Sequence, residues 1–248
     1  MVKILDNNIV VITGGSSGIG YATVKKVIEY GGIPVILDKE TPELSDGDNF
    51  EYIRTDISNE EEVNEAFKQI EEKLGLTYGL VNNAAISPKP SPSEDISDEI
   101  LKKTFSINVF GTFYCNKYAI MQMLKLGKGS IVNISSVIGK VGSKNTSIYA
   151  ASKSALIGMT KSDAITYSSK NIRFNVLLPG FVDTPLIKSN ARNSGNPELY
   201  YENLKLLHPI GRLAKAEEIA EMIVFLISER SSFITGSEIV IDGGYTSV

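Results

Sequence analysis

Short apolar runs alternate with longer amphipathic segments along most of this chain, and that alternation limits the folds open to it. Runs such as Val10-Val11-Ile12 and Val35-Ile36-Leu37 are apolar at consecutive positions. Strands have this pattern when helices cover both faces of a parallel sheet. Because strands that alternate with helices indicate βαβ units, the sequence predicts an α/β fold built on one parallel sheet.

The expected elements follow from this pattern. Seven apolar runs fit strands of the sheet, at residues 9–13, 33–37, 52–55, 79–82, 130–134, 173–178 and 238–241. The segments between them predict helices at about 18–30, 59–74, 97–126, 147–169 and 215–228. Ser58 and Glu61 fit a capping box, so we expect Ser58 to cap the second of these helices.

Two stretches interrupt the alternation. Pro88, Pro90 and Pro92 form a stiff loop after the fourth expected strand, and residues 183–212 form a long insertion after the sixth. Long loops are usually functional, and ligands bind beyond the carboxyl ends of strands in open α/β sheets. We interpret 183–212 as a substrate-binding loop of a single domain spanning residues 1–248, and we expect residues 185–207 within it to close as a lid.

Composition excludes several function classes. The net charge of −4 and the pI near 5.3 lack the basic character of a nucleic-acid binder. The apolar runs are too short to span a membrane, and Asp6 precedes any apolar core of a signal peptide. One cysteine, Cys115, and one histidine, His208, can form neither an internal disulfide nor a Cys–His metal cluster. We expect a cytoplasmic protein with no metal, membrane or nucleic-acid partner.

The first expected strand runs directly into a glycine-rich turn, which is followed by an amphipathic helix. Glycines at such a turn allow a tight bend, and they let a pyrophosphate approach backbone amides at the helix N-terminus. We therefore expect a nucleotide to contact Gly14, Ser16, Ser17, Gly18, Ile19 and Gly20.

An acid ends the second expected strand. Asp38 lies eighteen residues after Gly20, where a carboxylate can accept hydrogen bonds from a ribose diol and would repel a 2′-phosphate. This favours NAD over NADP. The alternatives are a solvated loop acid or a helix cap, and the neighbouring Lys39 could partly accommodate a phosphate.

Tyr149 and Lys153 are four residues apart at the start of an expected helix, so they share one face of it. A nearby ammonium favours a phenolate and makes the tyrosine available as an acid or base near neutrality. The alternative is an exposed tyrosine beside a solvated lysine. Ser135 and Ser136 end the preceding expected strand and place a hydroxyl at its carboxyl end.

Together these motifs resemble the short-chain dehydrogenase/reductase (SDR) family over essentially the whole chain. The spacing of Gly14, Gly18 and Gly20 is similar to the family's GxxxGxG pattern. The stretch Asn82-Asn83-Ala84-Ala85 is similar to its NNAG motif, with Ala85 in place of the last glycine. The resemblance implies a Rossmann-type, doubly wound, seven-stranded parallel sheet.

The resemblance also implies a catalytic tetrad of Asn108, Ser136, Tyr149 and Lys153. Ser136 is chosen over Ser135 because the family's serine lies thirteen residues before its tyrosine. Tyr149 would exchange the alcohol proton, Lys153 would stabilise the phenolate and bind the ribose, and Ser136 would donate to the substrate oxygen. Asn108 would hold a water that links Lys153 to solvent, unless it is an ordinary polar residue of a helix.

By the same resemblance, Asp56 would meet the adenine amino group, and Thr184 with the backbone of Val182 would hold the nicotinamide carboxamide. The other cofactor contacts implied are Ile57, Asn83, Ala84, Ala85, Tyr149, Lys153, Pro179 and Gly180. A homotetramer is also expected. The apolar residues at 97–126 that exceed one core-facing stripe are Phe105, Val109, Phe113 and Ala119.

These inferences predict an NAD(H)-dependent oxidoreductase that interconverts a secondary alcohol and its ketone. An NAD-dependent aldose dehydrogenase remains open. A 3-oxoacyl-thioester reductase would usually prefer NADP, which Asp38 disfavours, and the complete tetrad argues against a catalytically silent dinucleotide sensor. The expected pocket is apolar, and its lining residues are Ile86, Ile138, Phe181, Leu186 and Ile187. Lys144, Asn145 and Asn190 could add polar groups, and His208 lacks the acid partner of a catalytic base.

Overall fold

In the computed structural model, which describes residues 3–42 and 49–247, seven strands form one sheet in the order β3-β2-β1-β4-β5-β6-β7. Every neighbouring pair is parallel, which confirms the predicted doubly wound α/β fold. The strands are β1 (Ile9–Thr13), β2 (Ile33–Asp38), β3 (Glu51–Arg54), β4 (Gly79–Asn82), β5 (Gly129–Ile134), β6 (Ile172–Pro179) and β7 (Glu238–Ile241).

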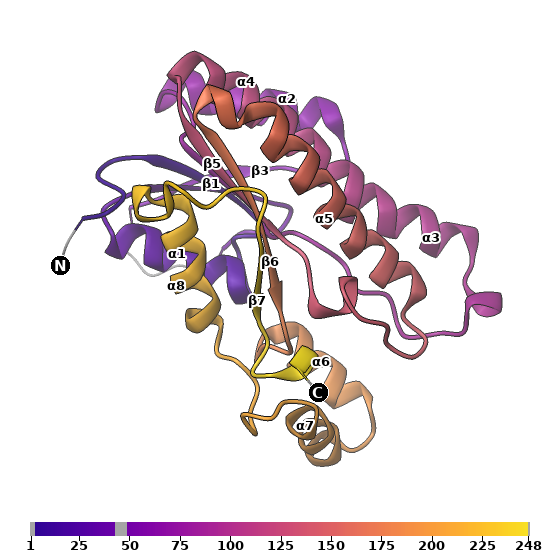
Figure 1. Cartoon of the computed structure of the whole chain (residues 1–248). Coiled ribbons are helices and arrows are strands. Elements are labelled where there is room, and N and C mark those ends of the chain that lie inside the picture. The colour runs from indigo at the N-terminus through magenta and orange to yellow at the C-terminus, as the bar shows by residue number, and fades with distance from the viewer. Residues whose placement is uncertain (1–2, 43–48, 248) are drawn as a thin grey trace.

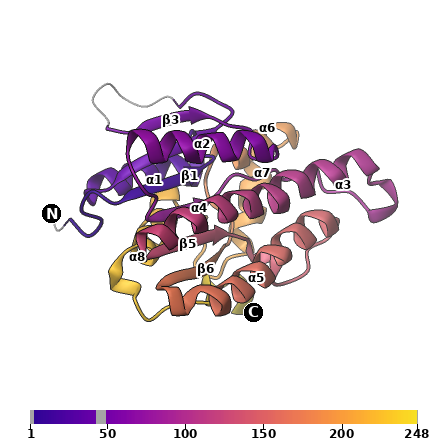
Figure 2. The same cartoon turned by 90° about the horizontal axis from the view of Figure 1, so that it is seen from above.

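Helices cover both faces of the sheet (Figures 1 and 2). Helices α1 (Gly18–Glu29) and α8 (Ala216–Ile227) lie on one face, and α2 (Glu60–Lys73), α4 (Thr112–Leu126) and α5 (Ser147–Tyr167) lie on the other. Successive strand residues point to opposite faces, so Val10 packs with the α1 and α8 side chains and Val11 packs with those of α2 and α4. This explains the runs of consecutive apolar residues.

The start of α2 differs from the prediction by one residue. Asn59 caps the helix, and its side-chain oxygen accepts from the amides of Glu61 at 3.0 Å and Glu62 at 3.4 Å. Ser58 is not the cap, because its hydroxyl donates to Asp56 at 2.7 Å.

The helix expected over 97–126 consists of three consecutive pieces. Helix α3 (Asp98–Phe105) leads into a π-helical segment, Ser106–Gly111, and then into α4. A π-helical turn holds one more residue than an α-helical turn and often marks a functional site. Asn108, a predicted site residue, lies inside this segment.

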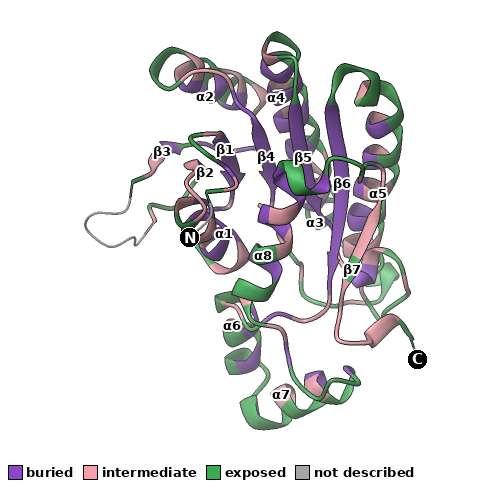
Figure 3. Ribbon diagram, turned by 60° about the vertical axis from the view of Figure 1, so that its left-hand side comes forward, coloured by how far each residue is buried: buried purple, intermediate pink, exposed green. Residues whose placement is uncertain are grey.

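The insertion after β6 is helical rather than a loop. It contains α6 (Pro185–Asn193) and α7 (Pro197–Leu206), which lie beyond the carboxyl ends of β6 and β7 with mostly exposed outer sides (Figures 1 and 3). Ile187 packs with Leu204 and Leu213 in a small core of its own, and its expected place in the lining of the substrate pocket stays a prediction. Residues 183–212 are called the lid below.

Short 3₁₀ turns complete the described structure, at Ser93–Asp95, Val137–Gly139, Ser168–Lys170, Glu229–Ser231 and Tyr245–Ser247. In the ranges 3–42 and 49–247, no helix combines the length and hydrophobicity that crossing a membrane would need. Across the same ranges, no three His, Cys, Asp or Glu side chains gather in a way that could hold a metal ion.

Candidate active site

The glycine-rich turn after β1 leaves no room for side chains. Gly14 has a φ of +65°, and a Cβ added to it would lie 2.9 Å from the Cα of Ala84. A Cβ on Gly20 would overlap the carbonyl oxygen of Gly14. The turn is therefore packed closely against both α1 and the segment that follows β4, as a backbone cradle for a phosphate requires.

The N-terminus of α1 is open to an anion. Ser17 is its N-cap residue, but the serine side chain makes no capping bond, and the first turn contains no acid. By contrast, α2 begins with the acids Glu60, Glu61 and Glu62. Because the first amides of a helix carry a partial positive charge, α1 fits a bound pyrophosphate and α2 does not.

Asn83 holds the glycine-rich turn in place. Its side-chain amide donates to the carbonyls of Thr13 and Gly14, both at 3.1 Å. In return, Thr13 Oγ1 accepts from the backbone amides of Asn83 and Ala84 at 3.0 Å. Ala85 has no positive φ, so the alanine that replaces the family's glycine is unstrained.

The adenosine end of the expected site holds two acids. Asp38 accepts from the backbone amides of Ser16 at 3.0 Å and Glu40 at 3.1 Å, which fixes its carboxylate beside the glycine-rich turn. Asp56 forms an ion pair with Lys39 at 2.9 Å. Burial raises the pKa of Asp56, but hydrogen bonds from Ser58 and Lys39 outweigh burial and leave that pKa below its ordinary value.

Ser136, Tyr149 and Lys153 come together where β5 ends and α5 begins. Tyr149 lies in the first turn of α5, and the Ser136 hydroxyl lies near enough to its phenol to act to lower the pKa of that phenol. The Lys153 ammonium lies one turn further along, 5.9 Å from the centre of the Tyr149 ring. It donates to the carbonyl of Ile134 at 2.8 Å.

The two neighbouring serines have different partners. Ser135 is buried and its hydroxyl donates to the Lys153 carbonyl at 2.8 Å. Ser136 is partly exposed, and its hydroxyl accepts from the Ile138 amide at 3.2 Å while also meeting the phenol. Of the two, Ser136 therefore has the hydroxyl placed to reach a substrate oxygen beside Tyr149.

Burial affects the two titratable groups in opposite directions. It raises the pKa of Tyr149 to about 12, although the Ser136 hydroxyl acts to lower it. It lowers the pKa of Lys153 to about 8. In both cases burial disfavours the charged form. A positive charge brought near the phenol would act in the opposite direction at Tyr149, because it would stabilise the phenolate and lower the pKa of the phenol.

Asn108 is a buried clamp between the loop after β4 and α5. Its side-chain oxygen accepts from the Ile86 amide at 2.9 Å, and its amide donates to the Ile86 carbonyl at 2.9 Å and to Ser152 Oγ at 3.1 Å. Ser152 in turn donates to the Tyr149 carbonyl at 2.8 Å. Both side-chain amide protons are used, so Asn108 could hold the expected water only as an acceptor, through Oδ1 or through its main-chain carbonyl, which also accepts from Thr112 Oγ1 at 2.9 Å.

The segment after β6 presents backbone to the expected nicotinamide. A parallel bridge joins Val182 to Ala214, in which the Asp183 amide donates to the Ala214 carbonyl at 2.8 Å and the Ala214 amide donates to the Phe181 carbonyl at 3.0 Å. Because successive residues of extended backbone point in opposite directions, the Val182 amide faces away from Ala214. Thr184 begins α6 without using its hydroxyl as a cap, and its methyl would lie 3.4 Å from a Cβ on Gly18.

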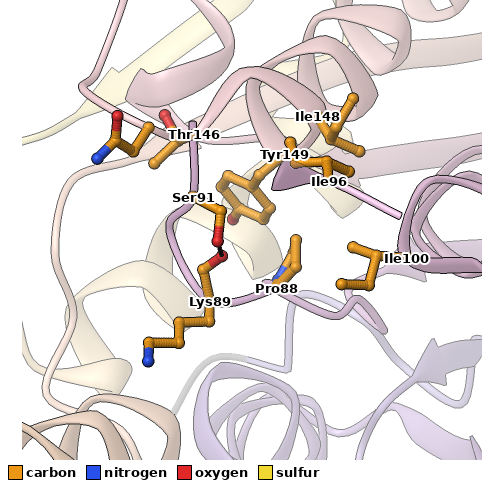
Figure 4. Close-up of a pocket in the computed structure, with 9 residues that line it drawn as sticks. Pro88, Lys89, Ser91, Ile96, Ile100, Thr146, Ile148 and Tyr149 are labelled. Carbon is orange, nitrogen blue, oxygen red and sulfur yellow. Dashed lines mark hydrogen bonds between the residues drawn. The ribbon is translucent and has the colours of Figure 1, made fainter. Parts of the chain in front are cut away.

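A small cavity of about 20 Å³ adjoins Tyr149 (Figure 4). Its apolar wall comes from Pro88, Ile96, Ile100 and Ile148, and the rest of its lining comes from Lys89, Ser91, Asn145, Thr146 and Tyr149. The proline-containing loop and the loop before α5 form opposite sides, and the Ser91 amide joins them by donating to the Asn145 carbonyl at 2.8 Å. None of the five lining residues expected from the sequence lines this cavity.

Several residues that shape the site had no signal in the sequence. Thr13 and Ser152 are ordinary polar residues whose partners lie 44 or more positions away. His208 is buried and joins the lid to Phe181. The sequence shows that His208 is the only histidine, but it does not show that the ring contacts the Phe181 amide, which is 27 positions away.

Comparisons with known proteins agree with this geometry. A profile of the family described as enoyl-(acyl carrier protein) reductase matches residues 14–246. A cis-4-hydroxycyclohexanecarboxylate dehydrogenase of Sinomonas cyclohexanicum is 36% identical over 247 residues, covering 97% of each chain. A 2,5-dichloro-2,5-cyclohexadiene-1,4-diol dehydrogenase of Sphingobium indicum is 38% identical over 98% of this chain and 99% of its own.

The fold matches solved structures equally well. A ligand-free aldohexose dehydrogenase of Thermoplasma acidophilum superposes with a TM-score of 0.94 at 32% identity, covering 100% of this chain and 97% of that one. The sheet order, the glycine-rich turn and the similarity over the full length all indicate the same family. The chain belongs to the short-chain dehydrogenase/reductase family.

Proposed function

We propose that this protein is an NAD(H)-dependent oxidoreductase that interconverts a secondary alcohol and its ketone. The observation that carries the proposal is the convergence of the Ser136 hydroxyl, the Tyr149 phenol and the Lys153 ammonium beside a glycine-lined phosphate cradle. A hydroxyl donor, a proton-exchanging phenol and a fixed cation are the groups that a carbonyl–alcohol interconversion needs.

Each side chain has a distinct part in this proposal. In the oxidative direction, the Tyr149 oxygen takes the proton of the substrate hydroxyl. Ser136 donates to the same substrate oxygen and stabilises the charge that develops there. Lys153 stabilises the phenolate electrostatically, and Ser152 and Asn108 fix the first turn of α5, where Tyr149 lies.

The residues present fit a nicotinamide dinucleotide. The glycine cradle and the acid-free start of α1 suit a pyrophosphate, and the outward-facing Val182 amide with the free Thr184 hydroxyl suits a carboxamide. When bound, NAD would accept the hydride from the carbinol carbon, and its positive ring would favour the phenolate.

Asp38 supports NAD as the preferred cofactor. Its carboxylate is held beside the glycine-rich turn by two backbone amides, where it would repel a 2′-phosphate. Lys39, the cation that could offset this repulsion, is paired with Asp56 at 2.9 Å. Both contacts favour a ribose with free hydroxyls over a phosphorylated one.

The substrate we propose is a compact, apolar secondary alcohol, cyclic or aromatic, or its ketone. The cavity beside Tyr149 has room for about one water-sized group, so it could take only a small part of a substrate, and four apolar side chains form its wall. The polar groups of Ser91 are already paired, because it donates its amide to the Asn145 carbonyl and its hydroxyl to the Lys89 carbonyl. The two relatives that act on substituted six-membered rings support the same choice.

An aldose dehydrogenase is the second candidate. It is favoured by the structural match to the aldohexose dehydrogenase and by Lys89 and Asn145 at the cavity, which could bind sugar hydroxyls if the loops rearranged. A 3-oxoacyl-thioester reductase, which would usually require NADP, fits the surroundings of Asp38 less well.

We also propose a single-domain subunit of a cytoplasmic homotetramer. Phe110 and Phe113 are about half exposed near the start of α4, as are Met121 and Leu124 further along it, and such a surface is suited to a partner subunit. Ala119, which the sequence analysis placed among these residues, is instead fully buried in the core. Light scattering that gives a mass near the 27.0 kDa monomer would contradict the tetramer.

Nicotinamide absorbance tests the proposed activity directly. The protein is mixed with NAD and each of a panel of secondary alcohols, and with NADH and the matching ketones. We expect cofactor turnover with at least one cyclic alcohol. No turnover in either direction, with NADH binding intact, would favour the dinucleotide sensor.

A further inference from the structure

His208 lies between two parts of the molecule that the proposed reaction needs. It is 4% exposed, and its ring centre lies 5.7 Å from that of Phe181, which it meets edge-on, and 5.7 Å from that of Tyr245, to which it is tilted. The proposed catalytic groups do not include it, and no acidic side chain hydrogen-bonds to its ring in residues 3–42 and 49–247.

Both ring nitrogens have backbone partners. Nε2 lies 3.1 Å from the Phe181 amide, and Nδ1 lies 2.8 Å from the Leu204 carbonyl. An amide can only donate and a carbonyl can only accept. Both contacts are hydrogen bonds only in the tautomer in which Nδ1 carries the proton and Nε2 accepts.

The two partners belong to different elements. Leu204 lies in the last turn of α7, where helix carbonyls have no partner within the helix. Phe181 immediately precedes Val182, whose amide faces the proposed nicotinamide site. The imidazole thus joins the lid to the segment that presents the cofactor contacts.

Backbone hydrogen bonds hold the chain on both sides of Phe181. The amide of Gly180 donates to Ile241 at 2.9 Å and that of Asp183 donates to Ala214 at 2.8 Å. The Phe181 amide donates to His208 Nε2 instead of to a backbone carbonyl. A Cβ on Gly180 would lie 2.8 Å from Nε2, so the ring is fitted against backbone that has no side chain at that position.

We propose that His208 is a positioning residue that contacts both lid helix α7 and the Phe181–Thr184 segment, so that its Phe181 bond positions the cofactor contacts and its Leu204 bond positions the lid. The inference rests on the proposed function only in taking Val182 and Thr184 as cofactor contacts. Loss of the Phe181 bond should weaken cofactor binding, and loss of the Leu204 bond should weaken substrate binding.

Two substitutions separate these bonds. In His208→Asn, the side-chain amide can replace Nδ1 and keep the Leu204 bond, but nothing accepts from Phe181. In His208→Gln, the side-chain oxygen can replace Nε2 and keep the Phe181 bond. We expect His208→Asn to raise the NADH dissociation constant about tenfold, as the loss of one buried hydrogen bond would. We expect His208→Gln to leave it within about twofold of wild type and to raise the substrate KM.

Asn196→Ala is the control for general loosening of the lid. Asn196 caps α7, where its side-chain oxygen accepts from the Leu199 amide at 3.1 Å. This bond does not involve the Phe181–Thr184 segment. The substitution should leave the NADH dissociation constant unchanged. Equal losses of NADH affinity in both His208 variants, or no change in either, would overturn the proposal.

A measurement on the wild-type chain covers the case in which the variants do not fold. Because the chain has one histidine, nitrogen-15 labelling of histidine yields a single pair of ring signals in the NMR spectrum. We expect a protonated Nδ1 and a hydrogen-bonded, unprotonated Nε2, with and without NADH. The opposite tautomer would overturn the proposal. If the wild type fails to bind NADH, the proposed function is contradicted. The tautomer measurement does not depend on NADH and would still test the role of His208.

Discussion

The Lys153 ammonium lies 5.9 Å from the centre of the Tyr149 ring while its proton donor is directed to the Ile134 carbonyl at 2.8 Å. The lysine therefore makes no direct hydrogen bond to the phenol, and the role proposed for it would depend on its charge alone. Burial raises the pKa of Tyr149 to about 12 and lowers that of Lys153 to about 8. This arrangement makes proton exchange by the phenol sensitive to any further positive charge at the site.

Tyr149→Phe should abolish turnover and leave NADH binding nearly intact, because it removes only the exchangeable proton. We expect kcat to fall at least about a hundredfold, measured by nicotinamide absorbance beside a fluorescence titration of NADH. Tyr167→Phe, on the same helix with its ring stacked on Phe174, is the matched control. Wild-type turnover in Tyr149→Phe would show that the proposed acid/base is wrong.

Lys153→Met should change how stability depends on pH. Burial lowers the pKa of Lys153 in the folded protein to about 8, from an ordinary value of 10.5, so the unfolded chain binds more protons between these two pH values. The free energy of unfolding of the wild type should therefore rise with pH across that window. Relative to Lys153→Met, we expect a gain of about 2 kcal/mol between pH 8 and about pH 9.5 in urea titrations. Parallel pH profiles for the two proteins would contradict the buried, depressed lysine.

Much of the fold could be predicted because burial on both faces leaves a local mark in the sequence. Strands β1, β4 and β7 have the predicted bounds, and the consecutive apolar residues of β2 identify a strand with helices on both sides. The spacing of Tyr149 and Lys153 likewise placed both residues on one face of α5, because four residues make about one helical turn.

The remaining features depend on contacts that local patterns do not contain. A π-helical turn at Ser106–Gly111 changes the apolar periodicity too little to be read from the sequence. Ser58 and Asn59 are both good caps, and the choice was decided by Asp56, which takes the serine hydroxyl. Asn108 reaches Ile86, 22 residues away in the sequence, so its clamp role is visible only in three dimensions.

Asp38→Asn should narrow the preference for NAD over NADP, because it removes the charge that repels a 2′-phosphate. We expect the ratio of kcat/KM values for the two cofactors to fall at least about tenfold. Some loss with NAD is also expected, since an amide cannot accept from both Ser16 and Glu40. Glu40→Gln neutralises the neighbouring acid, whose carboxylate does not touch Asp38, and should leave the ratio near that of wild type. Equal kcat/KM for NAD and NADP in the wild type would refute the cofactor preference.

Gly20→Ala should prevent NADH binding, because its Cβ would overlap the Gly14 carbonyl and displace the cradle. Gly142→Ala is the control, since a Cβ there meets no heavy atom within 4 Å and Gly142 has no left-handed φ. The measurements are an NADH fluorescence titration and a thermal melt of each variant. We expect a lower melting temperature for Gly20→Ala alone. Unchanged NADH affinity in Gly20→Ala would show that the cofactor lies elsewhere.

Side-by-side kinetics with cyclohexanol and glucose test the substrate proposal. The cavity beside Tyr149 has an apolar wall of Pro88, Ile96, Ile100 and Ile148, and the hydroxyls of Ser91 and Thr146 are already directed to backbone carbonyls. Each sugar hydroxyl buried there without a partner would cost on the order of 1 to 3 kcal/mol. We therefore expect kcat/KM for the cyclic alcohol to exceed that for glucose at least about tenfold. A clear preference for glucose would support the aldose dehydrogenase instead. Glucose binding would then require Lys89 and Asn145 to turn inward and supply the missing polar contacts.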